Sequence, residues 1–273
     1  MNLTPSTHTA DASATPATAA ASPGHSHGAQ VLATCRAEGR AALIGYLPVG
    51  FPSVEVSIEA MVAMVRAGVD IVEVGVPYSD PLMDGPVIQR ATETALQGGT
   101  RVDDVFTAVR AIADAGAAAY VMTYWNLVLR RGVQRFAADL AAAGGSGLIT
   151  PDLIPDEAGE WLAASDTRGL DRVFLVAPSS TPERLVIATE ACRGFVYAAS
   201  TMGVTGTRET VGSAAEDVVG RARAVTGVPV CVGLGVSTRA QAADVGRFAD
   251  GVIVGSALVR ALGEGGIPAL EAL

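Results

Sequence analysis

The segment "VEVSIEAMVAMVRAGVDIVEVG", residues 54–75, decides the fold class. Its first part is amphipathic at helical spacing and closes on Gly68, the residue type expected just beyond the C-terminus of a helix. Its second part, residues 71–75, is a short apolar run that is typical of a buried strand. A helix that leads directly into a buried strand is one half of a parallel βαβ unit.

The same alternation continues from residue 30 to the end of the chain. Further amphipathic segments occupy residues 102–116, 133–144 and 215–227. Strands are predicted at residues 42–47, 71–75, 119–123, 147–150, 172–176, 195–198, 229–232 and 251–254. Eight such units predict one (β/α)8 barrel over residues 30–273. An open doubly wound sheet is disfavoured because no Gly-x-Gly-x-x-Gly motif with a later acidic residue follows an early strand.

The two ends of the chain give weaker signals. Residues 1–29 are rich in Ala, Ser, Thr and Pro and show no helical or strand period. This composition predicts a disordered leader. Few residues follow the eighth predicted strand, so the last helix is expected to be short.

Composition and charge narrow the class of protein. The 273 residues are 49% hydrophobic, and the net charge of −9 comes without a cluster of basic residues. This disfavours nucleic acid and anionic membranes as partners. No stretch of about 20 apolar residues and no signal peptide is evident, which predicts a cytoplasmic protein. The three cysteines lie far apart and suggest neither a disulfide framework nor a zinc site.

Two side-chain types are missing where chemistry would use them. All 19 basic residues are Arg, so the chain cannot form a lysine Schiff base. The three histidines, His8, His25 and His27, all lie in the predicted leader. The barrel therefore has no imidazole for a Ser-His-Asp triad or a metal site, and no metal is expected. Acid–base chemistry is left to Asp, Glu and Tyr.

Three carboxylates lie on or after the second predicted strand. Glu73 shares a strand face with Ile71 and should point into the barrel, where burial would raise its pKa and suit it to acid–base catalysis. A buried ion pair with Arg is the alternative. Asp84 lies in a loop stiffened by prolines and is expected over the pocket. Asp80 and Asp84 could instead form an Asx-turn or a helix N-cap.

The last three strands each end in a glycine-containing turn. Backbone N–H groups near Gly206, Gly235, Gly255 and Ser256 could bind a phosphate, although ordinary turns with Ser256 as an N-cap would look similar. The segment 200–213 is long for a βα loop and is read either as a lid or as a plain loop. Four residues near strand ends predict an apolar pocket for a planar ring, with core packing as the alternative. These are Tyr46, Tyr124, Tyr197 and Leu234.

The motif "EVGVPYSDPLMDGPVIQ", residues 73–89, resembles the signature of the tryptophan synthase alpha chain family. The resemblance extends in the same order over residues 31–262. It includes "GYLPVGFPS", "MTYWNLV", "TPDLIPDE", "YAASTMGVTGTR", "VGLGVS" and "VGSALV". It implies a barrel lyase that splits indole-3-glycerol phosphate into indole and glyceraldehyde 3-phosphate. It also implies an alpha-two beta-two heterotetramer in which indole passes to the beta chain, and the beta chain alone carries pyridoxal phosphate.

The resemblance also implies roles for single residues. Glu73 would be the acid–base residue, and Asp84 would bind the indole N–H. Pro77 and Asp80 match positions that face the beta chain. The remaining matches concern the substrate pocket. Tyr197, Thr205, Gly206, Gly235, Gly255 and Ser256 match phosphate and lid positions, and Tyr46 and Leu234 match positions that often carry Phe against the indole ring.

Three rival functions remain open at this level. The chain could be a stand-alone lyase that releases free indole, or a non-catalytic subunit that activates a beta chain. A sugar-phosphate epimerase on the same barrel is disfavoured because such enzymes usually rely on His or metal ligands. The lack of Lys and His fits the lyase, because indole leaves as an enamine and its departure needs neither a Schiff base nor a metal.

Overall fold

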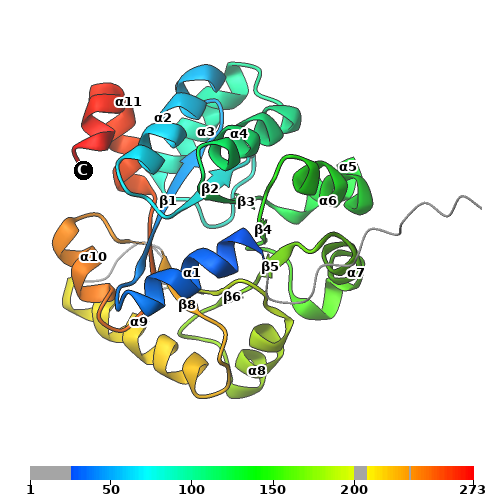
Figure 1. Cartoon of the computed structure of the whole chain (residues 1–273), viewed down its shortest axis with the longest axis vertical. Helices are drawn as coiled ribbons and strands as arrows, with labels where there is room; N and C mark the ends of the chain where they lie inside the picture. The colour runs from blue at the N-terminus through cyan, green and yellow to red at the C-terminus, as the bar shows by residue number, and fades with distance from the viewer. Residues whose placement is uncertain (1–25, 200–207, 234) are drawn as a thin grey trace, which may run out of the picture.

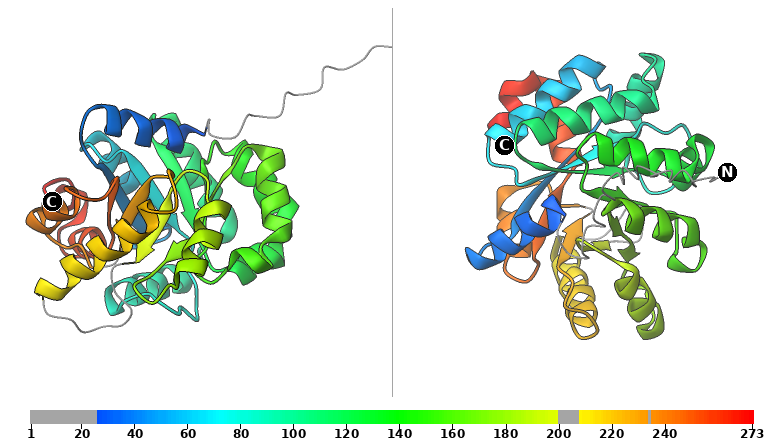
Figure 2. Two further views of the ribbon diagram at one scale, coloured as in Figure 1. Left: turned by 90° about the horizontal axis from the view of Figure 1, so that it is seen from below. Right: turned by 45° about the vertical axis from the view of Figure 1, so that its right-hand side comes forward.

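A curled sheet of parallel strands forms the centre of the molecule, and helices surround it (Figures 1 and 2). The computed structural model describes residues 26–199, 208–233 and 235–273. The strand order is β5-β4-β3-β2-β1-β9-β8-β7-β6. The strands are β1 (Ala42–Pro48), β2 (Ile71–Gly75), β3 (Ala118–Met122), β4 (Gly147–Ile149), β5 (Asp171–Val173), β6 (Leu175–Val176), β7 (Val196–Ala199), β8 (Val230–Gly233) and β9 (Gly251–Val254). The predicted (β/α)8 barrel is confirmed.

Helices surround the barrel, and in the described part of the chain one precedes the first strand, one follows the last, and the others lie between strands in the sequence (Figure 1). They are α1 (His27–Ala37), α2 (Val54–Arg66), α3 (Pro86–Gln97), α4 (Val102–Asp114), α5 (Trp125–Arg131), α6 (Val133–Ala142), the 3₁₀ turn η1 (Pro155–Glu157), α7 (Gly159–Arg168), α8 (Pro182–Ala191), α9 (Arg208–Arg223), α10 (Arg239–Val245) and α11 (Ser256–Glu271). Within the described ranges, no helix has the length and apolar character needed to cross a membrane.

The fifth predicted strand is divided into two. β5 pairs with β4, whereas β6 pairs with β7. Phe174 lies between them, and its N–H donates to the Cys192 thiol at 3.3 Å instead of to a neighbouring strand. One extended segment thus pairs with a different neighbour on each side, and this brings the two ends of the sheet together.

The α2–β2 unit shows why the sequence folds as it does. The Ser53 hydroxyl caps α2 by accepting from the Val56 N–H, and Gly68, with φ +106°, allows the sharp turn after the helix. In the register of the sheet, Glu73 lies between Tyr46 of β1 and Tyr120 of β3. The three side chains therefore share the inner face of the barrel.

Three boundaries differ from the sequence-based expectation. Helix α1 begins at His27, inside the segment predicted as a leader, while residues 1–25 lie outside the described residues. Helix α9 begins at Arg208, so residues 208–213 of the predicted 200–213 loop are helical, and residues 200–207 are not described. The expectation that the last helix is short was wrong, because α11 has 16 residues and continues beyond a kink at Gly266.

Helix α1 closes the N-terminal end of the barrel (Figures 1 and 2). Its Leu32 and Cys35 pack onto the inward-facing residues of the strands, among them Ile44 and Tyr120. The Ser26 hydroxyl, at the N-cap of α1, hydrogen-bonds the Asp171 carboxylate, and the Tyr120 hydroxyl donates to the same oxygen at 2.6 Å. The interior is thus sealed from solvent on this side.

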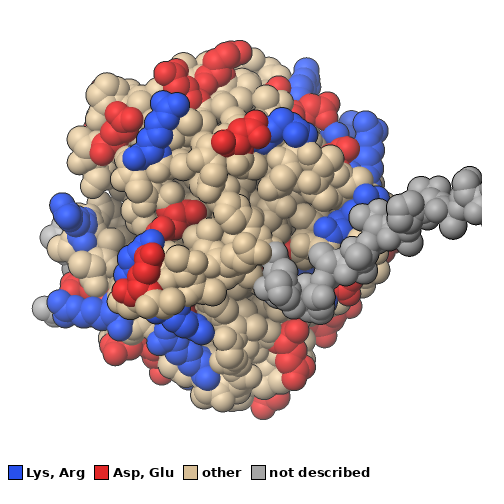
Figure 3. All heavy atoms as spheres, in the orientation of Figure 1, with Lys and Arg blue, Asp and Glu red and all other residues tan. Residues whose placement is uncertain are grey.

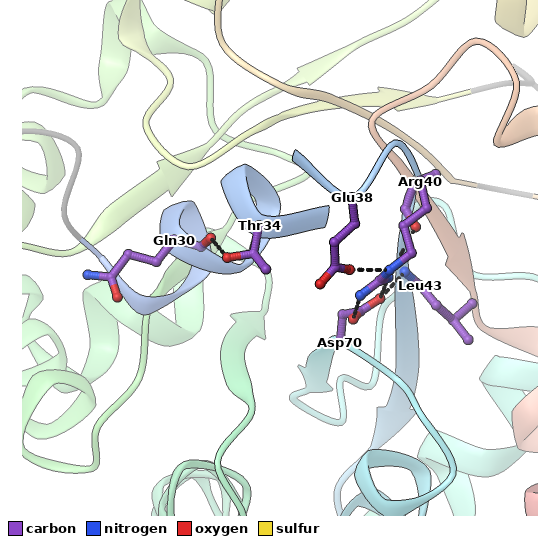
Figure 4. A network of polar contacts seen from close by, with 7 residues as sticks. Gln30, Thr34, Glu38, Arg40, Leu43 and Asp70 are labelled. Atoms are coloured by element: carbon purple, nitrogen blue, oxygen red, sulfur yellow. Dashed lines mark hydrogen bonds and ion pairs between the residues drawn. The ribbon is translucent and has the colours of Figure 1, made fainter. Parts of the chain in front are cut away.

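An ion-pair network lies beside α1 at the same end of the barrel (Figure 4). Asp70 accepts hydrogen bonds from two nitrogens of the Arg40 guanidinium, at 2.8 and 2.9 Å, and from the Leu43 N–H at 2.8 Å. Arg40 also donates to Glu38 at 2.7 Å. This network fastens the start of β1 to the start of β2. On the face of the molecule in Figure 3, basic and acidic side chains are mixed, and neither sign dominates a large area.

Replacing Tyr120 with phenylalanine should lower the free energy of unfolding by about 1–3 kcal/mol, because the change removes a buried hydrogen bond to a carboxylate. Tyr120 and Asp171 are both buried. Urea denaturation of the parent and the variant at neutral pH measures this difference. The hydroxyl lies at the end of the barrel that α1 closes, so catalytic activity should stay unchanged; a loss of activity with unchanged stability would contradict this assignment.

Candidate active site

Glu73 is a buried carboxyl group in the middle of β2. Its side chain is 0% exposed, and neither carboxyl oxygen has a hydrogen-bond partner among the described residues. No described arginine pairs with it, so the alternative of a buried ion pair gains no support. Burial raises the pKa of Glu73 from its ordinary 4.5 to about 8. The group can therefore hold a proton near neutral pH and release it to a bound molecule.

Two buried tyrosines, Tyr46 and Tyr197, lie around Glu73. Burial raises the pKa of both, and the charges of Glu73 and Asp84 raise it further, so both hydroxyls stay protonated. The rings approach the backbone closely at two glycines: a Cβ at Gly75 would lie 2.4 Å from the Tyr46 hydroxyl, and one at Gly233 would lie 2.1 Å from that of Tyr197. Both positions therefore require glycine to accommodate the tyrosines.

Asp84 lies in the loop between β2 and α3, just before the N-cap Gly85. It is half-buried, and burial raises its pKa to about 6. Its charge acts on Tyr46, Tyr124 and Tyr197, which places it in the same region as Glu73. Two carboxyl groups with separated pKa values thus face one region, an arrangement suited to giving them different tasks.

Tyr124 is attached to the Asp84 loop rather than only lining a pocket. Its hydroxyl oxygen accepts hydrogen bonds from the N–H groups of Leu82 (3.0 Å) and Met83 (3.3 Å). Its ring stacks on that of Tyr78 with 4.7 Å between the centroids. The loops after β2 and β3 are therefore joined at this point.

Asp80 and Pro77 lie on the same loop but in different surroundings. Asp80 is exposed and accepts a hydrogen bond from the Ser79 hydroxyl at 2.7 Å, whereas Pro77 is buried within this chain. The loop thus presents Asp80 to solvent. The expectation that both residues face a beta chain remains a prediction.

The glycine turns after β8 and β9 lie side by side, because these two strands are paired. Gly235 is exposed and has φ +104°. Gly255 is the N-cap of α11, so Ser256 is the first residue of that helix and not its cap. The first N–H groups of α11 have no partner within the helix and can bind an anion. Leu234, Thr205 and Gly206 lie outside the described residues.

The described part of the chain has neither a metal-binding cluster nor an accessible cysteine thiol. No group of three or more His, Cys, Asp or Glu there could hold a metal ion. Cys35, Cys192 and Cys231 are buried and free, and burial raises the pKa of each thiol. Their burial fits the expected role of small core side chains, and the Cys192 thiol in addition accepts the Phe174 N–H.

The sequence analysis missed two residues beside the site. The Asn126 side-chain amide donates to the Tyr78 hydroxyl at 3.0 Å, which supports the ring that stacks on Tyr124. Tyr78 lies between Pro77 and Asp80, so its place in the loop was a usable signal. No sequence signal pointed to Asn126, because its partner lies 48 residues earlier in the chain.

Comparison with known proteins points to one family. A family model described as tryptophan synthase alpha chain matches residues 32–271. The chain is 69% identical over 240 residues to the tryptophan synthase alpha chain of Mycobacterium marinum, and the match covers 88% of this chain and 89% of that protein. It is 68% identical over 243 residues to that of Mycobacterium tuberculosis, covering 89% and 90% of the two chains.

Solved structures agree with these sequence matches. A chain of Mycobacterium tuberculosis tryptophan synthase superposes with a TM-score of 0.86 at 65% identity, covering 91% of this chain and 95% of that one. Tryptophan synthase subunit alpha from Legionella pneumophila superposes with a TM-score of 0.83 at 30% identity, with 91% and 95% coverage. The barrel is thus similar to its solved counterparts over nearly its whole length.

Proposed function

Because the chain belongs to the tryptophan synthase alpha chain family, we propose that Glu73 and Asp84 carry out the reaction of that family in this protein. The chain is a lyase subunit of tryptophan biosynthesis and cleaves indole-3-glycerol phosphate to indole and glyceraldehyde 3-phosphate. The observation that carries the residue assignment is the buried carboxyl group of Glu73, which has no hydrogen-bond partner in the described part of the chain, together with Asp84, whose charge acts on the same tyrosine, Tyr46.

Glu73 is assigned the proton transfers. Its protonated carboxyl group gives a proton to C3 of the indole ring, and the resulting carboxylate takes the proton of the hydroxyl on the adjacent side-chain carbon. The electrons of that O–H bond form the aldehyde carbonyl, and those of the breaking carbon–carbon bond return to the ring as indole leaves. The carboxyl group is protonated again at the end. A pKa of about 8 supports this double use near neutral pH.

Asp84 is assigned to the ring nitrogen. Protonation at C3 leaves a positive charge spread over the ring and its N–H, and a nearby carboxylate stabilises that charge. The prolines before and after Asp84 in the loop, together with its half-buried position, support a fixed carboxylate. Tyr46 and Tyr197 would flank the apolar ring of the substrate.

The phosphate of the substrate is assigned to the turns after β8 and β9. The N–H groups at the start of α11 and the exposed backbone of Gly235 support anion binding. Thr205, Gly206 and Leu234 keep their proposed roles in lid, phosphate and ring binding by resemblance alone.

This subunit pairs with a tryptophan synthase beta chain, and pyridoxal phosphate belongs to that partner. An alpha-two beta-two heterotetramer is the assembly we expect. Pro77 and Asp80 are proposed to face the beta chain. We also place the protein in the cytoplasm, which is supported by its three free, buried cysteines, since such thiols suit a reducing compartment.

The pH dependence of kcat/KM for cleavage should be bell-shaped. Asp84 must be ionised to stabilise the positive ring, so activity should fall as the pH drops below about 6. Glu73 must be protonated to supply its proton, so activity should also fall as the pH rises above about 8. Initial rates of indole release in buffers from pH 4.5 to 9.5 test this. An acid limb near pH 4, or no alkaline limb, would contradict the two assignments.

The function itself is tested by mixing the purified chain with indole-3-glycerol phosphate and following indole release, with and without a beta chain. Slow release that rises sharply with the beta chain supports the proposed subunit. Fast release by the isolated chain would instead favour a stand-alone lyase. Release under neither condition would overturn the assignment and leave a non-catalytic activating subunit.

A further inference from the structure

The loop that carries Asp84 is held from both sides by polar contacts. After Asp84, the Gln89 side-chain amide donates to the Asp84 carbonyl oxygen at 2.8 Å. Before it, the N–H groups of Leu82 and Met83 donate to the Tyr124 hydroxyl. The Leu82 side chain is 79% exposed and offers little packing of its own. The position of this part of the loop therefore depends on hydrogen bonds.

We propose that the Tyr124 hydroxyl is a positioning group that fixes Asp84 for the reaction by holding the backbone of Leu82 and Met83. This inference rests on the proposed function of Asp84 and deepens it. The sequence suggested only that Tyr124 lines the substrate pocket. The geometry assigns its hydroxyl oxygen to the loop instead.

Tyr124 is itself firmly placed, as a positioning residue must be. Its side chain is buried and stacks on Tyr78, which Asn126 holds through a hydrogen bond at 3.0 Å. The next residue, Trp125, donates its N–H to both oxygens of the Asp152 carboxylate at 2.9 and 3.0 Å. The Tyr124 hydroxyl, in the loop after β3, is thus held in one position and can fix the loop after β2 through its hydrogen bonds.

Tyr124→Phe is the direct test, because it removes the hydroxyl and keeps the ring. We expect kcat for indole release to fall about 10- to 100-fold, while KM changes less than about threefold. The acid limb of the pH profile should move to lower pH, because a loosened Asp84 gains water. Among the described residues, the charge of Asp84 acts on Tyr46, Tyr124 and Tyr197, and the pKa of each of these hydroxyls is raised. Glu73, whose charge acts on Tyr46 and Tyr197 as well, has a pKa of about 8 and titrates on the alkaline side of the profile.

A double-mutant cycle with Asp84→Asn separates the two possible roles of Tyr124. If the hydroxyl acts through Asp84, Tyr124→Phe should change kcat less than about twofold in the Asp84→Asn background. An equal fractional loss in both backgrounds would show direct action on the substrate and overturn the proposal. An unchanged kcat in the single variant would overturn it as well. Failure of the parent protein to release indole would instead count against the proposed function.

Tyr120→Phe is the matched control, since it removes a buried tyrosine hydroxyl at the opposite end of the barrel. It should lower stability without changing kcat or the pH profile. Should Tyr124→Phe not fold, Leu82→Pro removes the shorter of the two bonds from the loop side and leaves that of the Met83 N–H, so a smaller fall in kcat and a shift of the acid limb in the same direction are expected. A parent-like kcat in that variant would overturn the proposal.

Discussion

Replacing Glu73 with glutamine should lower kcat for indole release by about 10²- to 10⁴-fold, the usual contribution of a positioned acid–base group. Glutamine has almost the same size and keeps the shape of the pocket, but it cannot give up and regain a proton. Binding of an analogue that lacks the side-chain hydroxyl should therefore change little. Steady-state kinetics with the beta chain present, together with a titration of the analogue, measures both quantities.

The stability of the Glu73→Gln variant provides an internal check. The pKa of Glu73 is raised on folding, so between pH 4.5 and about 8 the folded state holds a proton that the unfolded state has lost. As the pH rises across that window, the free energy of unfolding of the parent should therefore fall relative to that of the variant, by about 1.4 kcal/mol per pH unit. Glu59→Gln, an exposed change on α2, is the matched control. Parent-like cleavage by Glu73→Gln would refute the assignment.

Replacing Asp84 with asparagine should lower kcat by about 10²- to 10³-fold, the range seen when one electrostatic stabiliser of a transition state is removed. The amide is isosteric with the carboxylate but carries no charge to oppose that of the protonated ring. The acid limb of the pH profile near pH 6 should disappear at the same time, because the group that titrates there is gone.

The matched control for this change is Asp114→Asn, which removes one exposed carboxylate at the end of α4. It should have parent-like kcat and keep the acid limb. If the acid limb persisted in Asp84→Asn, another group would have to be responsible for it. A parent-like kcat in Asp84→Asn would contradict the proposal that the Asp84 carboxylate stabilises the positive charge of the protonated ring.

Local sequence patterns were sufficient to predict most of the helices and strands. Caps, glycine stops and short apolar runs are local features, so α2 and β2 were found with nearly correct ends. The length of the last helix was underestimated because it was inferred from the few residues that follow the eighth strand, whereas α11 uses 16 of them and only Gly266 departs from helical geometry. The break at Phe174 was missed because it depends on a distant thiol, that of Cys192.

The candidate site also has some features that the sequence predicted and others that it could not. The alternation of a strand placed Glu73 on the inner face, and the prolines around Asp84 indicated a fixed loop. Neither pattern could reveal that Glu73 lacks a partner among the described residues, or that Tyr124 hydrogen-bonds the loop before Asp84. Those facts depend on where separate strands bring their side chains.

By itself, the sequence determined the barrel, the lack of Lys and of His outside the N-terminal segment, and the carboxylates that remain to transfer protons. These follow from residue types and from spacing over a few positions. Only the tertiary structure decided that the pKa of Glu73 is raised, that it is higher than the pKa of Asp84, and that the loop before Asp84 is hydrogen-bonded to Tyr124. Burial and long-range hydrogen bonds arise from residues far apart in the chain, so no local pattern encodes them.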